Sequence, residues 1–572
     1  MRQSHDEVFT IGIGGAAGDG VRESGNTLGA ILAELGYESF LSFTYPSLIR
    51  GGHNFARISF SKEKIFSDHV ALDVLVALNE ESIVLHRDEM ATGAVVLADT
   101  FETPDLAILK ENAVAVPMSA TVKEMGAPAI TRNSMALGAI CYLLDLDFDL
   151  MQKVLGDVFK NKMPEVNIKL ADAGYQLLKT KNFRHPKKIE PSESKKEFID
   201  GNSAFAKGLM AAGLDFYVGY PMTPATSILQ FLAGAQKNST LHVIQPESEL
   251  SAINMALGMS YAGKRVAIGS ATGGFALMQE AFSFAGGAEL PLVVAVSQRQ
   301  APATGLPTYS SQTDLRFAIH AGHGEFPRIV MAPGDAEESF YLGALSLNLA
   351  WQYQLPVIVL MDKIISEHSA TAFLDASTIK VERGLIAGAD KIGEKYGRYE
   401  ITADGISPMA FPGTPETVVK VTSYEHDTAG ITVDEPEPTE IMLQKRFTKS
   451  ETLRKSLAER ETVKIYGDKA SKNVVVFWGS TKGPLLEAVK YLKGPIKFVQ
   501  IVWLEPFDME KVAVHLRDAK KIIDVECNHD GQLAALIREK TGIEVTDKIL
   551  KYDSRPFEPI ALADEINKKL EK

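Results

Sequence analysis

Short runs of β-branched and other apolar residues recur in the middle of this chain, and they alternate with segments of helical periodicity. The runs are Phe216–Val218, Leu241–Ile244, Val266–Gly269, Leu292–Val296, Arg328–Met331 and Val357–Leu360. Strands that alternate with helices are joined by right-handed crossovers and form a parallel sheet covered on both faces. We therefore predict an α/β fold that binds its ligands at the carboxyl edge of the sheet.

At 572 residues the chain is too long for a single core, and similar patterning flanks the central segment. The first segment opens with a predicted strand, Val8–Ile13, a glycine-rich turn, Gly14–Gly20, and an amphipathic helix. We predict three α/β units with mainly parallel sheets, at residues 1–185, 199–383 and 469–572. A lysine-rich linker at 186–198 and a proline- and glycine-rich connector at 384–468 would join them. Within the connector, Glu451–Arg460 is predicted to be an exposed helix.

Composition excludes several classes of protein. A net charge of −13 argues against a nucleic-acid binder, which needs a basic face. The two cysteines, Cys141 and Cys527, are far apart, so we expect neither a disulfide framework nor an iron–sulfur cluster on this chain. We see no signal peptide and no apolar run near the ~20 residues that cross a bilayer, so a soluble cytoplasmic protein is expected.

Polar loops follow four of the predicted central strands, and their shared position at one sheet edge is a stronger signal than any one loop. They are Tyr220-Pro221-Met222-Thr223-Pro224, Gln245–Glu249, Ser270–Gly274 and Arg299–Thr308. The two prolines hold Thr223 in a rigid loop, and an arginine at a strand end can bind a carboxylate through two hydrogen bonds.

Simpler explanations stay open for each loop. The Tyr-Pro segment can be a structural turn, and a lone arginine can form a surface ion pair. Two acids at a helix start stabilise the helix dipole by ~0.3–1 kcal/mol, which would be sufficient reason for Glu247 and Glu249.

The order of these motifs resembles the α subunit of 2-oxoacid:ferredoxin oxidoreductases, in the form with a γ domain fused to its N-terminus. The resemblance covers nearly the whole chain. It also includes Arg50-Gly51-Gly52-His53, Asp404–Pro408, Tyr424-Glu425-His426-Asp427, Trp478-Gly479-Ser480-Thr481 and Asn528-His529-Asp530-Gly531-Gln532. It implies a γ-type domain, a pyrimidine-type thiamine diphosphate domain and a transketolase-C-terminal-like domain.

In this family, thiamine diphosphate lies between the α and β chains, and the β chain holds Mg²⁺ and a [4Fe–4S] cluster. The resemblance therefore implies a β subunit as partner, in an αβ heterodimer or (αβ)2, with coenzyme A as substrate and ferredoxin as electron acceptor. No nucleic-acid or membrane partner is expected.

By position, Glu249 would be the carboxylate that hydrogen-bonds the pyrimidine ring of thiamine diphosphate and so promotes loss of the thiazolium proton. Glu247 is the competing candidate. Thr223 and Arg299 would orient the 2-oxo-carboxylate of the substrate, supported by Thr308. Further cofactor-side residues would be Tyr220, Pro221, Thr272 and Gly273. Many relatives have Thr-Ser-Gly-Pro-Gly where this chain has Ser270–Gly274, so the roles of that turn stay open.

The N-terminal turn allows two ligands. Gly12-x-Gly14-x-x-Ala17 partly fits a dinucleotide fingerprint, with Glu38 near the position of a ribose-binding acid. In the family this domain is associated with coenzyme A, whose phosphates suit a helix N-terminus equally well. We expect coenzyme A at Gly14, Gly15 and Gly18 in preference to NAD, with a purely structural turn as the remaining alternative. The roles of Arg50 and His53 stay open.

Two other functions compete with this enzyme: a different thiamine enzyme component, or a non-catalytic scaffold. The Arg-x-x-Pro-x-Thr-Gly-Leu-Pro-Thr loop argues against the first, and the retained Thr223, Glu249 and Arg299 argue against the second. Members with this fusion often act on 2-oxoglutarate, while relatives use pyruvate or branched-chain 2-oxoacids. The sequence fixes neither the site of a distal carboxylate nor the direction, oxidative or towards carbon fixation in a reductive TCA cycle.

Overall fold

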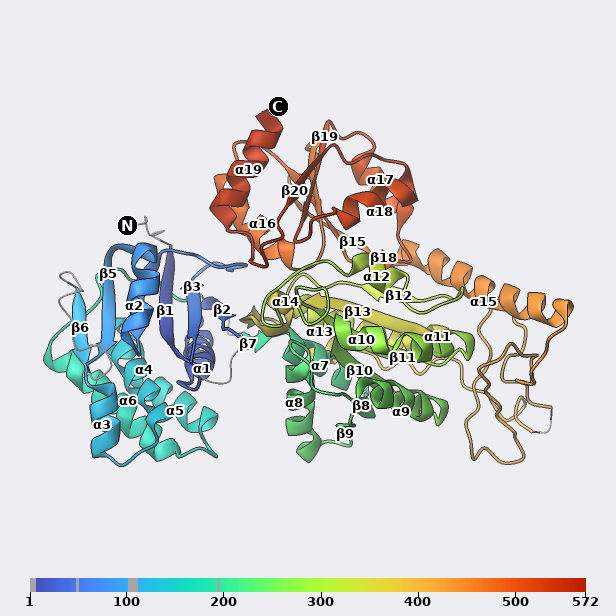
Figure 1. The fold of residues 1–572 in the computed structure, drawn as a ribbon, viewed down its shortest axis with the longest axis horizontal. Coiled ribbons are helices and arrows are strands. Elements are labelled where there is room, and N and C mark those ends of the chain that lie inside the picture. Colours follow the sequence, from blue (N-terminus) through green and yellow to red (C-terminus); the bar gives the residue numbers. More distant parts are fainter. Residues whose placement is uncertain (1–6, 48–50, 101–111, 193–195, 394, 572) are drawn as a thin grey trace. The chain divides into compact units, whose positions relative to one another are not determined.

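The computed structural model describes residues 7–47, 51–100, 112–192, 196–393 and 395–571. Contacts divide the chain into two compact units, Met1–Asp200 with His368–Phe373, and Gly201–Glu367 with Leu374–Lys572. The described residues form three sheets of eight, seven and five strands, each flanked by helices (Figure 1). The predicted α/β fold class is confirmed.

The first unit holds an eight-stranded sheet in the order β6-β5-β4-β1-β3-β2-β14-β7. The pairs from β6 to β1 are parallel, and those from β1 to β7 are antiparallel. The antiparallel half arises because β3 returns between β1 and β2. The strands are β1 (Val8–Ala16), β2 (Glu38–Thr44), β3 (His53–Ser61), β4 (Leu72–Ala77), β5 (Met90–Asp99), β6 (Ala113–Val116), β7 (Glu197–Asp200) and β14 (Ser369–Ala372).

Two strands of this sheet come from beyond the first 185 residues. Strand β7 contains Glu197 and Phe198, the end of the predicted linker, and β14 comes from the segment predicted to belong to the second unit. Strand β14 lies between β2 and β7. The helices of the first unit are α1 (Val21–Glu34), α2 (Glu80–His86), α3 (Met118–Glu124), α4 (Arg132–Leu143), α5 (Phe148–Val158) and α6 (Pro164–Thr180).

The second unit contains the predicted central sheet, in the order β18-β12-β13-β11-β10-β8-β9. All of its pairs are parallel except β12 with β18. Strands β10, β11 and β13 are buried along their whole length, as expected when helices cover both faces. The strands are β8 (Phe216–Val218), β9 (His242–Ile244), β10 (Val266–Ala271), β11 (Leu292–Gln298), β12 (Ile329–Met331), β13 (Pro356–Asp362) and β18 (Trp503–Glu505).

Two of the helices that cover this sheet, α7 and α13, pack closely against each other because α7 has a glycine at the contact. Gly208 of α7 lies against the carbonyl of Phe340 in α13, and a Cβ at Gly208 would overlap with that oxygen. The helices are α7 (Gly201–Ala211), α8 (Thr226–Ala235), α9 (Glu249–Tyr261), α10 (Thr272–Leu277), α11 (Gln279–Gly287), α12 (Leu315–Ile319), α13 (Ala336–Tyr353) and α14 (Lys363–Glu367).

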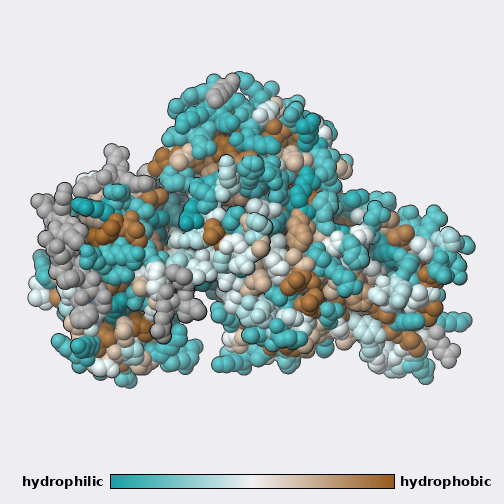
Figure 2. Space-filling view, viewed as in Figure 1, coloured by the Kyte–Doolittle hydropathy of each residue, from teal (hydrophilic) through white to brown (hydrophobic). Residues whose placement is uncertain are grey.

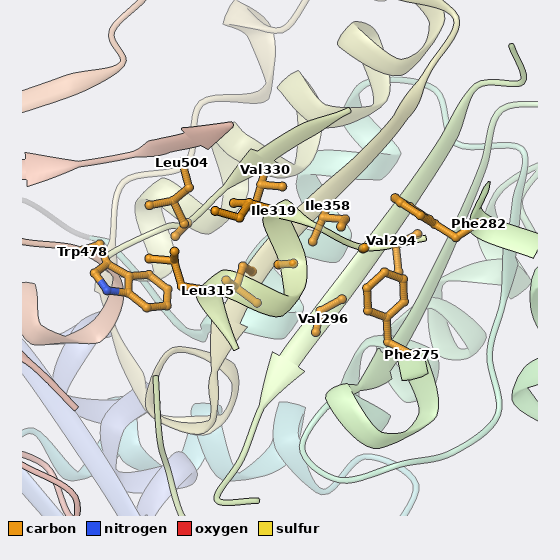
Figure 3. Close-up of a cluster of buried hydrophobic side chains, with 14 of the residues drawn as sticks. Phe275, Phe282, Val294, Val296, Leu315, Ile319, Val330, Ile358, Trp478 and Leu504 are labelled. Atoms are coloured by element: carbon orange, nitrogen blue, oxygen red, sulfur yellow. The ribbon is translucent and has the colours of Figure 1, made fainter. Parts of the chain in front are cut away.

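The C-terminal sheet has the order β15-β17-β16-β19-β20 and is parallel except for β15 with β17. Its core is continuous with that of the central sheet: Trp478 and Leu504 lie beside Leu315 in one buried cluster (Figure 3). The elements are β15 (Val463–Gly467), β16 (Asn473–Phe477), β17 (Lys497–Ile501), β19 (Lys521–Glu526), β20 (Asp547–Leu550), α16 (Lys482–Ala488), α17 (Met509–Leu516), α18 (Gln532–Thr541) and α19 (Pro559–Glu571).

The connector contains a longer helix than predicted, α15 (Pro436–Ser456). The prediction that Glu451–Arg460 is simply exposed was wrong, because Leu453 and Leu457 are buried. One and two turns before Leu453, Lys449 and Lys445 are buried as well, since both bind the carboxylate of Glu289, which precedes β11. The helix is thus anchored to the central domain by buried charges.

Both cysteines are buried and unbonded, and burial raises the pKa of Cys141 to about 12. Within the described residues, no helix has the length and apolar character that crossing a membrane requires.

Candidate active site

The four polar loops of the central domain lie at one edge of the sheet. Strands β11, β10, β8 and β9 are neighbours and run parallel, so the segments that follow them emerge together. This places the four predicted loops beside one another, as the strand order requires.

Glu249 is the first residue of α9 and is buried, with 5% of its surface exposed. Ser248 caps the helix by accepting a hydrogen bond from the backbone N–H of Ser251 at 3.2 Å. The Oε1 atom of Glu249 is buried and has no hydrogen-bond partner in the structure. A buried carboxylate oxygen without a partner is costly, so its retention indicates a role towards a ligand.

Glu247 has a different environment. Its carboxylate is exposed and accepts a hydrogen bond from the Ser251 hydroxyl, which lowers the pKa of Glu247. Of the two candidate acids, only Glu249 therefore combines burial with an unsatisfied oxygen, and the geometry favours it as the cofactor-facing residue.

The turn from β10 into α10 packs directly against Glu249. A Cβ at Gly274 would lie 2.8 Å from Glu249 Oε1 and would overlap with the Oγ of Ser270. Gly273 is exposed, and a Cβ there would have no atom within 4 Å. Thr272 donates a hydrogen bond from Oγ1 to Asp314 Oδ2 at 2.7 Å. Thr272 is thus hydrogen-bonded to Asp314, Gly273 is exposed, and Gly274 packs against Glu249.

Arg299 and Thr223 are in direct contact. The Arg299 Nη1 atom donates to the backbone carbonyl of Thr223 at 2.7 Å, and burial lowers the pKa of the Arg299 guanidinium. The loop that holds Thr223 also contains Tyr220, which is 37% exposed, and Pro221, which is half-buried. The two predicted substrate-binding residues are therefore brought together on neighbouring loops.

Thr308 is buried at 4% exposure, and its Oγ1 has no partner in the structure. The chain between Arg299 and Thr308 closes on itself through a hydrogen bond from Leu306 N to Gln300 O at 3.0 Å. Gly305 has a φ of 53°, and a Cβ there would overlap with the Gln300 carbonyl, so this loop requires glycine at that position.

Sequence reasoning missed Asp314 and Gln298. Asp314 accepts from Thr272, and its own backbone N–H donates to Gln298 Oε1 at 3.0 Å. Burial raises the pKa of Asp314, and Gln298 is fully buried at the end of β11, with its Nε2 unpartnered. No motif marks either residue, because their contacts depend on three separate segments.

The two C-terminal motifs hold the segment around Asp314. Gln312 donates from Nε2 to the Trp478 carbonyl at 2.7 Å and accepts from Cys527 N at 2.8 Å. Asn528 and Gln532 donate to the backbone carbonyls of Gln312 and Thr313. The motifs thus join the C-terminal domain to the active-site edge.

In the first unit, Gly14 and Gly15 lie within β1 and are buried, whereas the turn prediction placed them after the strand. Strand β1 continues to Ala16 because β3 pairs with it up to Ala16–His53. Gly18 is exposed with a φ of 97° and lines a cavity of about 390 Å³ at the N-terminus of α1. Of the three predicted coenzyme A residues, Gly18 alone lines this cavity.

The cavity has an apolar wall and two unsatisfied amide oxygens. Val21, Phe43 and Ile130 line it, together with Asn54 and Asn133. The Oδ1 atoms of both asparagines are buried without a partner. The cavity could therefore receive a group with hydrogen-bond donors.

The NAD alternative fits less well. Glu38 lies at the start of β2 and is buried, and its carboxylate is bound by Lys196 and by the Thr371 hydroxyl. A ribose-binding acid would have to be available to a ligand, and the Glu38 carboxylate is already engaged.

His53 lies in a hydrogen-bonded series of side chains on the other face of β3 from Asn54. Its Nε2 is 2.8 Å from Nε2 of His86, and His86 Nδ1 is 2.7 Å from Glu89 Oε2. Burial, followed by the neighbouring His86, lowers the pKa of His53 to about 4. Arg50 lies outside the described residues.

Comparison with known proteins agrees with this architecture. A family model described as pyruvate flavodoxin/ferredoxin oxidoreductase, thiamine diphosphate-binding, matches residues 207–445, and one described as pyruvate ferredoxin/flavodoxin oxidoreductase matches residues 10–177. The chain is 32% identical to a 2-oxoacid:ferredoxin oxidoreductase subunit alpha from Sulfolobus sp., over 98% of this chain and 96% of that protein. It is 26% identical to 2-oxoglutarate oxidoreductase subunit KorA of Mycobacterium tuberculosis, over 99% and 93%.

A solved structure matches over the full length. The 2-oxoglutarate:ferredoxin oxidoreductase from Magnetococcus marinus, with 2-oxoglutarate, coenzyme A and succinyl-CoA bound, gives a TM-score of 0.87 at 31% identity. The match covers 99% of this chain and 100% of that one.

Fold and site together define a thiamine diphosphate-binding oxidoreductase component. The chain belongs to the α subunits of the 2-oxoacid:ferredoxin oxidoreductases.

Proposed function

We propose that this chain is the α subunit of a 2-oxoglutarate:ferredoxin oxidoreductase. The enzyme would convert 2-oxoglutarate and coenzyme A to succinyl-CoA and CO2, and would pass two electrons to ferredoxin through a [4Fe–4S] cluster on its β subunit. The reaction would be reversible.

The observation that carries the proposal is the buried, unpartnered Oε1 of Glu249. It fits a cofactor with a hydrogen-bonding ring, because a ligand donor or protonated ring nitrogen would satisfy that oxygen. When bound, thiamine diphosphate supplies a carbon nucleophile that attacks the keto carbon of a 2-oxoacid. Glu249 would hold or move a proton at the pyrimidine ring, and its burial keeps water from competing for the carboxylate.

The substrate carboxylate would be bound by Arg299. This guanidinium uses one Nη1 hydrogen bond to fix Thr223, which leaves donors for an incoming carboxylate. The unpartnered hydroxyl of Thr308 would add a further hydrogen bond. Specificity for 2-oxoglutarate is supported by the full-length similarity to the Magnetococcus marinus enzyme.

Coenzyme A would use the first unit, where the cavity at the N-terminus of α1 offers an apolar wall and two amide oxygens. Arg22 and Lys162, which also line this cavity, would neutralise phosphates. Gly18 leaves room for close approach, whereas Gly14 and Gly15 would act only by packing β1.

A β subunit would hold the remaining cofactors, Mg²⁺ and the [4Fe–4S] cluster. Such a cluster is usually held by four cysteine thiolates, whereas this sequence has two cysteines, which are buried and far apart in sequence. The exposed side of α9 and α10 carries Leu250, Met255 and Leu277, which are 52%, 41% and 55% exposed. Figure 2 shows hydrophobic atoms gathered over α10, beside Glu249's helix. Such a surface suits a permanent partner.

The test is an assay of the complex expressed with its β partner under anaerobic conditions. Reduction of a low-potential dye should require both 2-oxoglutarate and coenzyme A. Glu249→Gln should abolish it, because the amide cannot exchange a proton with the ring, while Glu247→Gln, a matched change at an exposed site, should retain activity.

Activity only with pyruvate or a branched-chain 2-oxoacid would contradict 2-oxoglutarate as the substrate but would agree with the proposed reaction type. If a complex with its cluster in place were inactive with every 2-oxoacid, the proposal that it is a 2-oxoacid:ferredoxin oxidoreductase would be contradicted.

A further inference from the structure

The carboxylate of Glu249 has an unusual neighbour, the backbone of α10. Gly274 is buried, and a Cβ built on it would lie 2.8 Å from both Cγ and Oε1 of Glu249. Real Cβ atoms do not approach heavy atoms this closely, so a side chain at this position requires the neighbouring atoms to shift. Because residue 274 is glycine, the backbone of α10 can lie directly against the side chain of Glu249.

Ser270 closes the other side of the same position. Its Oγ would overlap with a Cβ at Gly274, and it donates a hydrogen bond to the sulfur of Met222 at 3.8 Å. Ser270 is completely buried at the end of β10. A methyl group at Gly274 therefore has no free volume to enter, and the strain must be relieved by movement of Ser270 or Glu249.

The turn itself is fixed by hydrogen bonds from outside α10. Thr272 binds Asp314, Asp314 N binds Gln298, and the segment that carries Asp314 is held by the C-terminal domain through Gln312. Thr272, Asp314 and Gln298 are all buried. These hydrogen bonds therefore oppose a movement of α10 away from an added methyl group.

We propose that Gly274 is a positioning residue that sets the location of the Glu249 carboxylate, with Ser270 and the Thr272–Asp314 hydrogen bond holding the turn. This inference rests on the proposed function of Glu249. It assigns a role to a turn whose sequence departs from that of many relatives.

The experiment compares Gly274→Ala with Gly234→Ala in the complete complex with its β partner. Both positions lie inside helices of the same domain, where helix propensity favours alanine over glycine, but Gly234 of α8 is exposed and a Cβ there would have no atom within 4 Å. The first readout is exchange of the C2 proton of bound thiamine diphosphate with D2O, measured by acid quench and NMR. The second is the dissociation constant of thiamine diphosphate.

We expect Gly274→Ala to slow C2 proton exchange by about 10- to 100-fold, because displacement of a catalytic group by up to 1 Å has an effect of this size. Gly234→Ala should exchange at the native rate. Ser270→Ala in the Gly274→Ala background should restore part of the rate, since it frees the space that Oγ occupied. A merely structural role would lower the yield of folded complex without this selective loss and rescue.

Equal exchange rates in the two alanine variants would overturn the inference. Should Gly274→Ala not fold, the double variant is compared with Ser270→Ala alone: a several-fold slower rate supports the inference, and an equal rate refutes it. Glu249→Gln tests the proposed role of Glu249 separately. If this variant exchanges at the native rate, the role of Glu249 is wrong; if it exchanges slowly while Gly274→Ala does not, only the role of Gly274 is wrong.

Discussion

Replacing Glu289 by glutamine should destabilise the connector severely. Glu289 and both lysines that bind it, Lys445 and Lys449, are at most 1% exposed. Burial alone would raise the pKa of Glu289, but these lysines and Arg398 hold it far below its usual range, so the carboxylate is ionised. Glutamine keeps the shape and one acceptor but leaves the buried cations without a counter-charge.

The magnitude follows from what remains around the ammonium groups. In the variant, Lys445 would keep the Gly405 carbonyl at 3.2 Å and Lys449 the Gln354 carbonyl at 3.2 Å. Removing one partner of a buried ion pair costs about 3–5 kcal/mol. For a protein of 572 residues, the melting temperature should fall by about 2–4 °C, and protection of α15 against hydrogen exchange should be lost first.

Two further variants refine the test. Glu400→Gln removes the exposed partner of Lys391 in the same connector and should cost at most about 1 kcal/mol. Lys449→Met in the Glu289→Gln background should recover part of the loss, because burial lowers the pKa of Lys449 to about 7. A depressed lysine pKa favours folding above about pH 10.5 and loses that contribution as pH falls through about 7. A melting temperature within about 1 °C of native for Glu289→Gln would refute the reasoning.

Three other changes test separate parts of the molecule. Gly208→Ala places a methyl group on the carbonyl of Phe340 and should destabilise the α7–α13 packing by about 1–3 kcal/mol, measured by thermal denaturation; a neutral result would contradict the close approach. Arg299→Lys loses the planar guanidinium that binds the Thr223 carbonyl, so KM for the 2-oxoacid should rise about tenfold or more in steady-state assays, and an unchanged KM would exclude it from substrate binding. Because burial lowers the pKa of His53 from 6.5 to about 4, its neutral form stabilises the first unit above about pH 6.5, and this is lost as pH falls through about 4; His53→Gln should flatten acid unfolding in that range, and an identical acid profile would contradict it.

The strands of the central sheet could be predicted because each is a short, continuous β-branched run. Val266–Gly269 and Leu292–Val296, for example, lie within β10 and β11. Such runs carry their own signal, since a strand buried on both faces is apolar along its whole length. Glu249 could be singled out because its motif follows one of these strands.

Other features depend on contacts that no local pattern encodes. The role of Gly274 arises from Glu249 and Ser270, and that of Asp314 from Thr272 on another loop. The burial of Lys449 was missed because a lysine is expected at the surface until Glu289 is placed beside it.

Strand β14 has a consequence for how this gene product can be divided. All four residues of Ser369–Ala372 pair with β7, and Ser369 and Ala370 also pair with β2, so the chain enters the first sheet, leaves it and enters it again. A fragment cut after Asp200 would lack the strand between β2 and β7, leaving β7 unpaired and the β2 edge open to aggregation. An independently expressed N-terminal domain would therefore need residues 368–373 grafted onto it, or supplied as a peptide, to complete its sheet.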